Sequence, residues 1–247
     1  MTPKEAYEYA LNNGLSEETR KIACKDSYWA YIYALEIDQC PRDDTREAAC
    51  EFPQTTYFYS PPNNNTEIEC YDLGWAYRYA MDIDKCPRED TRKSACNYPQ
   101  HALEYAENID KCPRDDTRKA ACKDPEWAYC YALEIDKKSH TNTREAACKD
   151  PRQALAYARD IDKCPRDDTR KAACKDPKYA CEYAGNVDQC PRDDTRNAAC
   201  KDPEYAYEYA KYVDKGFHED TWLAVKGTEY EKEYKKAFNN SIKELII

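Results

Sequence analysis

The chain has 247 residues, a formal net charge of −10, 35% charged residues and only five glycines. The surplus of negative charge repels phosphates, so strong general affinity for nucleic acid or for anionic membranes is not expected. No run of about 18 apolar residues occurs, and the first residues, MTPKEAYEYALNNG, lack the apolar core of a secretory signal. These features predict a soluble, cytoplasmic protein with no membrane partner.

The sequence repeats itself along most of its length. An Ala-Ala-Cys block, or a variant of it, recurs every 26 residues except for one step of 20. The cysteines of this block are Cys24, Cys50, Cys70, Cys96, Cys122, Cys148, Cys174 and Cys200. A fixed period of this size is typical of solenoid proteins.

One half of each unit predicts a helix, here called helix B. In the stretch KDPEWAYCYALEIDK, Asp124 suits the N-cap and Pro125 the first helical position. Ala128, Tyr131 and Ile135 then follow the spacing of one buried helix face. The tyrosine predicts nine copies of helix B, at Tyr9, Tyr33, Tyr59, Tyr79, Tyr105, Tyr131, Tyr157, Tyr183 and Tyr209.

The other half, PRDDTRKAACK, predicts a second helix, helix A. Pro113 opens it, and Asp115 and Asp116 lie in the first turn, where the helix dipole favours negative charge. Thr117 and the following alanines form a thin inner face. Both helices are too short to be stable alone, so stacking of successive units must stabilise them.

The predicted fold class is therefore all-α: a right-handed α-solenoid of about nine 26-residue αα repeats in a single domain. Residues 1–214 form the tandem array. Residues 215–247 keep the rhythm, but Glu231 and Lys235 stand where other copies of helix B have alanine. A polar outer face suits a terminal repeat, so this segment is expected to be a C-terminal cap.

The step of 20 residues falls in EFPQTTYFYSPPNNNTEIEC, residues 51–70. Pro61 and Pro62 interrupt helix formation there, and Tyr57, Phe58 and Tyr59 add aromatic side chains. We interpret the segment as a degenerate repeat; a binding insertion and a bend remain alternatives.

Fifteen cysteines suggest disulfides, and five pairs are spaced nine residues apart as C-x9-C. If helix A lies between them, each pair is separated by about 15 Å, whereas a disulfide needs Cα atoms about 5.5 Å apart. The sequence contains no C-x2-C motif, so it does not predict a zinc site. We therefore expect small buried thiols rather than disulfides between neighbouring repeats or a metal site, and interpret Cys130 and Cys181, off the repeat positions, as exposed.

Nothing in the sequence predicts catalysis. His101, His140 and His218 lie in different units with no recurring nucleophile beside them, and the glycines form no nucleotide-binding motif. Paired carboxylates such as Asp115 and Asp116 recur with the repeat, which suits capping better than a single active site. We predict a protein that is not an enzyme, with no catalytic residues and no cofactor.

The repeated arginines allow two interpretations. Arg114 and Arg118 lie four residues apart on helix A, and stacked copies could bind phosphates. The favoured alternative is a series of Arg–Asp salt bridges between units, because an aspartate ends each helix B. These aspartates are Asp38, Asp84, Asp110, Asp136, Asp162, Asp188 and Asp214.

Positions that differ between copies are those the scaffold leaves free for recognition. On helix B they lie opposite the Tyr/Ala face, and they are more apolar in the N-terminal half. The candidate partner-binding residues are Tyr28, Ile32, Leu35, Tyr57, Phe58, Arg78, Met81 and Leu133.

The helix B stretches KDPEWAYCYALEIDK and KDPEYAYEYAKYVDKGF resemble the KDP-x-x-A-Y-x-Y-A tandem repeats of HEAT-like proteins encoded by bacteriophages and giant viruses. The resemblance covers nearly the whole chain and brings no catalytic residues. It implies a viral protein in the host cytoplasm that binds and inhibits a host factor, such as a defence component. The alternative function is related to nucleic acid, through phosphate-binding arginines or acidic mimicry of DNA.

Overall fold

A computed structural model describes residues 1–51, 58–59, 68–69 and 74–245. The chain divides into two compact units, Met1–Ala121 and Cys122–Ile247. In the first unit the elements are α1 (Pro3–Asn13), α2 (Glu17–Ala23), α3 (Ser27–Tyr33), η1 (Ala34–Asp38), α4 (Asp43–Glu51), β1 (Phe58–Tyr59), β2 (Ile68–Glu69), α5 (Trp75–Tyr79), η2 (Ala80–Asp84), α6 (Glu89–Ala95), α7 (Pro99–Tyr105), η3 (Ala106–Asp110) and α8 (Asp115–Ala121).

The second unit continues the same alternation. Its elements are α9 (Pro125–Tyr131), η4 (Ala132–Asp136), α10 (Thr141–Ala147), α11 (Pro151–Tyr157), η5 (Ala158–Asp162), α12 (Asp167–Ala173), α13 (Pro177–Tyr183), η6 (Ala184–Asp188), α14 (Asp193–Ala199), α15 (Pro203–Glu208), η7 (Tyr209–Asp214), α16 (Glu219–Val225) and α17 (Glu231–Leu245).

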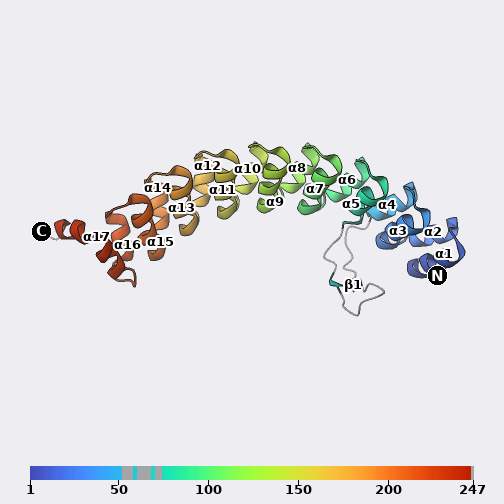
Figure 1. Ribbon diagram of the computed structural model, residues 1–247, viewed down its shortest axis with the longest axis horizontal. Coiled ribbons are helices and arrows are strands. Elements are labelled where there is room, and N and C mark those ends of the chain that lie inside the picture. Colours follow the sequence, from blue (N-terminus) through green and yellow to red (C-terminus); the bar gives the residue numbers. More distant parts are fainter. Residues whose placement is uncertain (52–57, 60–67, 70–73, 246–247) are drawn as a thin grey trace. The chain divides into compact units, whose positions relative to one another are not determined.

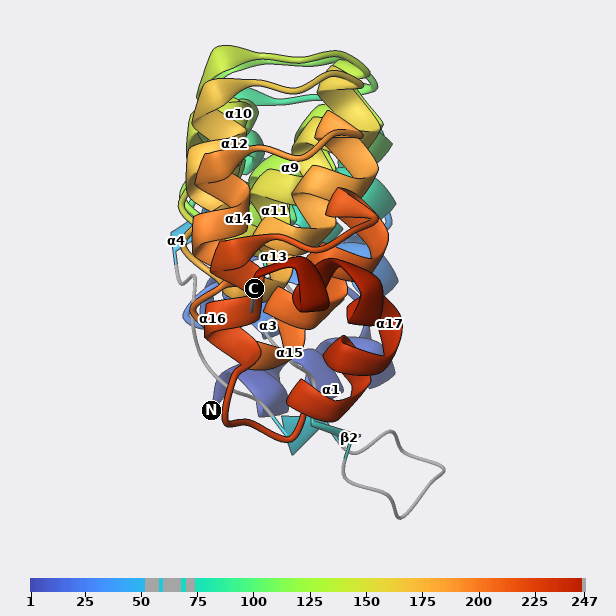
Figure 2. The same ribbon diagram turned by 90° about the vertical axis from the view of Figure 1, so that its left-hand side faces the viewer.

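Within each unit the even-numbered α-helices are copies of helix A and the odd-numbered ones are copies of helix B (Figure 1). The last helix, α17, ends the series. Figure 2 shows the arrangement in the second unit, where α10, α12 and α14 form one row and α9, α11 and α13 form a second row beside it. This is an α-solenoid, and the predicted all-α fold class is confirmed.

A buried tyrosine joins the two helices of each repeat. The tyrosine hydroxyl reaches the first turn of helix A, where the Tyr183 hydroxyl lies 2.8 Å from the hydroxyl of Thr169. The same hydroxyl accepts the N–H of Arg166 at 3.1 Å and lies 3.2 Å from its carbonyl oxygen. Because Arg166 makes no capping bond with its own side chain, the tyrosine satisfies a backbone group that the helix start leaves unpaired.

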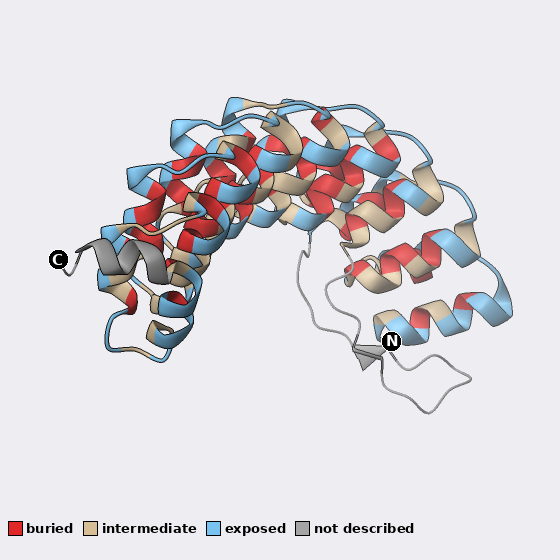
Figure 3. Ribbon diagram, turned by 60° about the vertical axis from the view of Figure 1, so that its left-hand side comes forward, coloured by how far each residue is buried: buried red, intermediate tan, exposed pale blue. Residues whose placement is uncertain are grey.

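The Thr–Tyr bond recurs along both units with nearly constant geometry. The other pairs are Thr19–Tyr33, Thr45–Tyr79, Thr91–Tyr105, Thr143–Tyr157, Thr195–Tyr209 and Thr221–Tyr234, at 2.7–2.9 Å. These tyrosines are fully buried among alanines, and Figure 3 shows the buried positions between the two rows of helices. The predicted Tyr/Ala core is confirmed.

Tyr9 differs from the other tyrosines of this position, because it is 52% exposed. The prediction that Tyr9 belongs to the buried series is therefore wrong.

Helix B does not end as a regular α-helix. In seven copies the last turn widens into a π-helical segment, η1 to η7, as in the bond from the N–H of Gln39 to the carbonyl of Ala34 at 2.9 Å. Each segment is followed by a left-handed residue with φ of 52–54°: Gln39, Lys85, Lys111, Lys137, Lys163, Gln189 and Lys215. The 3.6-residue spacing of the sequence does not reveal this change of helix type.

The irregular segment at 51–70 is an insertion within one repeat rather than a repeat of its own. Ile68–Glu69 forms a short strand that pairs with Phe58–Tyr59, so the expected copy of helix B at Tyr59 is wrong. Cys70, the cysteine expected in an Ala-Ala-Cys block, lies outside the described residues. Thr45 bonds to Tyr79, 34 residues later, whereas other pairs are 14 residues apart. The insertion between α4 and α5 therefore has 20 residues.

At the C-terminal end, α16 and α17 extend the array. Tyr234 on α17 is buried and lies 2.7 Å from the Thr221 hydroxyl, so the Thr–Tyr bond continues there. The helix is kinked at Phe238, where the backbone leaves helical geometry. The role of residues 215–247 as a cap remains a prediction.

Candidate functional site

The repeated arginines of helix A are buried and paired with aspartates. In one geometry, Arg170 donates from Nε and Nη2 to Asp188 at 2.8–3.0 Å and from Nη1 to Asp167 at 2.8 Å. Arg46 and Arg196 make the same contacts with their own pairs of aspartates. The aspartate three residues before each of these arginines holds the guanidinium toward its own repeat.

A second geometry occurs where that preceding residue is not aspartate. Arg20, Arg92 and Arg144 follow Glu17, Glu89 and Thr141 by three residues. These three arginines donate from Nε to an aspartate of the next repeat, namely Asp44, Asp116 and Asp168, at 2.8–2.9 Å. These three arginines therefore bridge two repeats, but through an aspartate of the next helix A. The predicted partners, the aspartates that end helix B, lie in the same repeat as each arginine, as Asp110 does for Arg92.

The second geometry leaves buried carboxylates short of donors. One oxygen of Asp38, one of Asp110 and both of Asp162 are buried without a hydrogen-bond partner. Burial raises the pKa of Asp38 and Asp110, although nearby arginines oppose the shift. Burial also acts on Asp116, but hydrogen bonds from Arg92 and from the Thr117 N–H outweigh it and lower the pKa of that carboxyl.

The cysteines are free, as predicted, for every cysteine that the structure describes. The Ala-Ala-Cys thiols are half-buried, and burial raises the pKa of Cys50 to about 12 and of Cys174 to about 11. The prediction of buried thiols is wrong for the cysteines that precede proline, which are exposed: Cys40, Cys86, Cys112, Cys164 and Cys190. It is also wrong to expect Cys181 at the surface, because that side chain is buried.

In the first unit, three adjacent copies of helix B expose an apolar side chain at the same repeat position. These residues, here called the apolar row, are Leu11, Leu35 and Met81, which are 57%, 37% and 45% exposed. Helices α1, α3 and α5 contact one another in sequence. In the second unit, Leu133 is 40% exposed at this position, but the next three copies have Arg159, Gly185 and Lys211.

Two of the predicted partner-binding residues pack within the fold. Tyr28 is half-buried and its ring lies 5.0 Å from that of Trp75. Ile32 packs against the core around Tyr31 and Tyr79. Leu35, the third candidate residue from this copy of helix B, stays at the surface.

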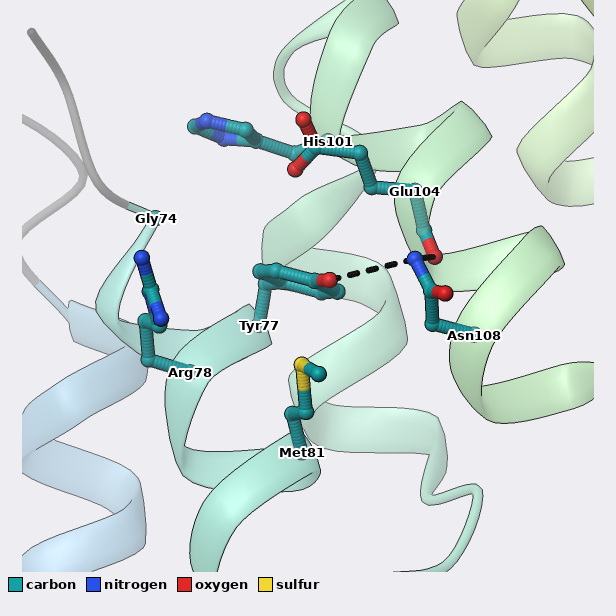
Figure 4. A pocket seen from close by; sticks show the side chains of 7 residues that line it. All are labelled: Gly74, Tyr77, Arg78, Met81, His101, Glu104 and Asn108. Carbon is teal, nitrogen blue, oxygen red and sulfur yellow. Dashed lines mark hydrogen bonds between the residues drawn. The ribbon is translucent and has the colours of Figure 1, made fainter.

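Arg78 and Met81 line a shallow depression of about 290 Å³ between α5/η2 and α7/η3. Its other lining residues are Gly74, Tyr77, His101, Glu104 and Asn108. Figure 4 shows the Tyr77 ring in the middle of the group, with its hydroxyl accepting a hydrogen bond from the Asn108 side chain at 3.2 Å. The sequence did not single out Tyr77, Glu104 and Asn108 as neighbours.

Between α3 and α5, the positions equivalent to Gly74 and His101 hold two aromatic residues, Tyr28 and Trp75, whose rings lie 5.0 Å apart. A Cβ atom at residue 74 would lie 2.7 Å from Nδ1 of the His101 side chain, so any other residue there requires that ring to move. That Nδ1 is buried and has no hydrogen-bond partner.

In each unit, a tyrosine hydroxyl group also joins successive copies of helix B. Tyr31 donates to Asp82 at 2.7 Å, and Tyr129 donates to Asp160 at 2.9 Å. Burial and the bond to the carboxylate raise the pKa of Tyr129 to about 12. These bonds fix carboxylates at the surface between neighbouring helices.

Three predicted partner-binding residues remain. Tyr57 lies outside the described residues, and Phe58 is in β1. Leu133 belongs to the second unit.

Across the described ranges, no group of three His, Cys, Asp or Glu side chains converges as a metal site. None of the helices in the same ranges combines the length and apolar character needed to cross a membrane. No protein-family model, curated protein or solved structure matches the sequence.

Proposed function

We propose that the protein is a non-enzymatic scaffold that binds a protein partner on the helix B surface of its first unit. The apolar row carries this proposal, because adjacent exposed apolar side chains with charged neighbours are typical of interaction surfaces. The depression beside Met81 adds a recess at the end of the row. From the resemblance to viral repeat proteins, we further propose that the partner is a host factor and that the protein inhibits it.

The arrangement of charge favours this function over nucleic-acid binding. The buried arginines already use their guanidinium groups on aspartates, as Arg46 does with Asp43 and Asp84. The more exposed arginines also lie near carboxylates, with Arg192 3.4 Å from Asp194. Phosphate binding by the arginine series would require these pairs to break.

Capture from host-cell lysate tests the proposal. The immobilised chain is compared with a double variant, Leu35→Glu with Met81→Glu, and with the control Leu133→Glu, which changes the same repeat position in the second unit. We expect the double variant to lose proteins that the wild type and the control retain, because a charge in the apolar row opposes burial. Equal capture by all three proteins would contradict the proposal.

A salt titration of the captured complex tests the nucleic-acid alternative. Phosphate contacts weaken steeply as salt rises, whereas an apolar contact responds little. We expect capture to survive nuclease treatment and to weaken with salt much less steeply than phosphate binding does.

A further inference from the structure

We infer that the occupant of the apolar row is a positively charged amphipathic α-helix. This inference rests on the proposed function and names the chemistry of the partner. It follows from the charge beside the row, the spacing of the row and the depression at its end.

The apolar row is bordered mainly by carboxylates. Glu36 and Asp82 directly follow Leu35 and Met81 in the sequence, and each accepts a hydrogen bond from a tyrosine of the preceding helix. The other carboxylates beside the row are Glu8 on α1, which lies 3.8 Å from Lys4, and Glu104 and Glu107 on the adjacent α7 and η3. The basic residues are Lys4 and Arg78. A ligand with lysine or arginine on both sides of an apolar stripe complements this surface.

The repeat spacing suits a helical ligand. Packed helices lie about 8–10 Å apart, and residues seven apart on an α-helix are separated by about 10.5 Å along its axis. A helix that crosses α1, α3 and α5 therefore presents one apolar residue of each heptad to Leu11, Leu35 and Met81 in turn. Its intervening basic residues reach the carboxylates on either side.

The depression provides a place for one basic side chain of that helix. Tyr77 and Met81 offer apolar surface to a methylene stem, and Glu104 offers a carboxylate whose described hydrogen-bond partner is the neutral Gln100, at 2.9 Å. The methylene stem of a lysine or arginine can lie on this apolar surface while its charged group pairs with the Glu104 carboxylate.

A synthetic peptide tests the inference directly. The probe is a fluorescently labelled three-heptad helix with leucine at one position per heptad and lysine on both flanks, and its twin has glutamate in place of lysine. Binding to the full-length chain is followed by fluorescence anisotropy. We expect the basic peptide to bind and the acidic twin to bind at least about tenfold more weakly.

Variants locate the binding site. The double variant Leu35→Ser with Met81→Ser is expected to bind the basic peptide about tenfold more weakly than the wild type. The double variant Glu104→Gln with Glu107→Gln is expected to bind it about threefold more weakly. The controls are Leu133→Ser, at the repeat position of Leu35 and Met81, and Glu134→Gln, which removes a carboxylate at the repeat position of Glu36 and Asp82 in the second unit; both are expected to leave binding unchanged. Circular dichroism checks that each variant keeps its helical content.

Three results would overturn the inference: equal binding of both peptides, equal loss in the control variants, or preference for a basic proline-rich peptide that cannot form a helix. Failure here is separable from failure of the proposed function. If lysate capture depends on Leu35 and Met81 while the basic peptide does not bind, the partner chemistry is wrong and the binding surface stands.

Discussion

At the scale of single residues, one buried hydroxyl group links helix B to the start of helix A. Tyr183 shows the arrangement: its ring packs with Leu155 and Val187, and its hydroxyl meets Thr169 and the backbone of Arg166. Hydrophobic burial and helix capping therefore depend on the same side chain.

Removing that hydroxyl should destabilise the protein. Tyr183→Phe keeps the ring but leaves the Arg166 N–H and the Thr169 hydroxyl without this partner, which costs about 1–3 kcal/mol. Urea unfolding followed by circular dichroism measures the change. Tyr9→Phe is the matched control, because Tyr9 holds the same repeat position at the surface. A similar loss in both variants would contradict the capping role.

The two classes of cysteine should differ in reactivity. The exposed thiols Cys40, Cys86, Cys112, Cys164 and Cys190 are expected to react with iodoacetamide within minutes at pH 8. Those of Cys24, Cys50, Cys174 and Cys181 should stay largely unmodified, because burial raises their pKa to about 11–12 and keeps them protonated. Peptide mapping by mass spectrometry measures the labelling. Uniform labelling of the folded protein would be inconsistent with the observed burial.

At the scale of elements, the residue three positions before each buried arginine decides which repeat that arginine joins. An aspartate holds the guanidinium within its own repeat, as Asp167 does for Arg170. Without it, the arginine bonds to the next repeat, as Arg144 does with Asp168. The difference determines how well the buried aspartate at the end of helix B is paired.

Substituting that aspartate should therefore have different outcomes in the two geometries. Asp188→Asn removes the bidentate, buried partner of Arg170 and should cost about 3 kcal/mol, because the guanidinium then keeps only the exposed carboxylate of Asp167. Asp162→Asn should cost less, about 1 kcal/mol, since neither oxygen of Asp162 has a hydrogen-bond partner and its ion pair with Arg144 is long, at 3.9 Å. The unfolding free energies of the two variants test this difference. Equal losses of unfolding free energy would show that the pairing geometry has no energetic role.

At the scale of the whole molecule, the array tolerates an insertion without losing its register. The bond between Thr45 and Tyr79 has the same length as those in uninterrupted repeats, although 20 more residues lie between the partners. Repeat proteins allow this because each unit contacts mainly its neighbours, so a longer connection does not disturb the stacking.

Deleting residues 52–71 should leave the solenoid intact. The deletion joins Glu51 to Asp72 and produces CEDLGW, which matches CKDPEW at 122–127 and restores the usual 14-residue separation. We expect unchanged helical content, and a shorter loop adds only a small entropic gain. Circular dichroism and urea unfolding measure both quantities. Loss of cooperative unfolding would show that the segment is needed for the fold.

The sequence alone determined the period, the order of helices A and B and the buried Tyr/Ala core, because apolar spacing and N-cap residues act locally and recur in every copy. It also predicted paired arginines and unbridged cysteines. The sequence pattern assigned residues 51–70 to a repeat because a cysteine there resembles the cysteine of the Ala-Ala-Cys block. Only the Thr45–Tyr79 contact revealed that the segment is an insertion.

The tertiary structure alone decided which side chains share a surface. Tyr28 and Ile32 face Trp75 and the core, whereas Leu35 and Met81 stay exposed, although all four appear equally variable in the sequence. The depression beside Tyr77 likewise depends on packing between successive repeats. Residues of different copies become neighbours only when the helices stack, and the sequence of one copy does not contain that information.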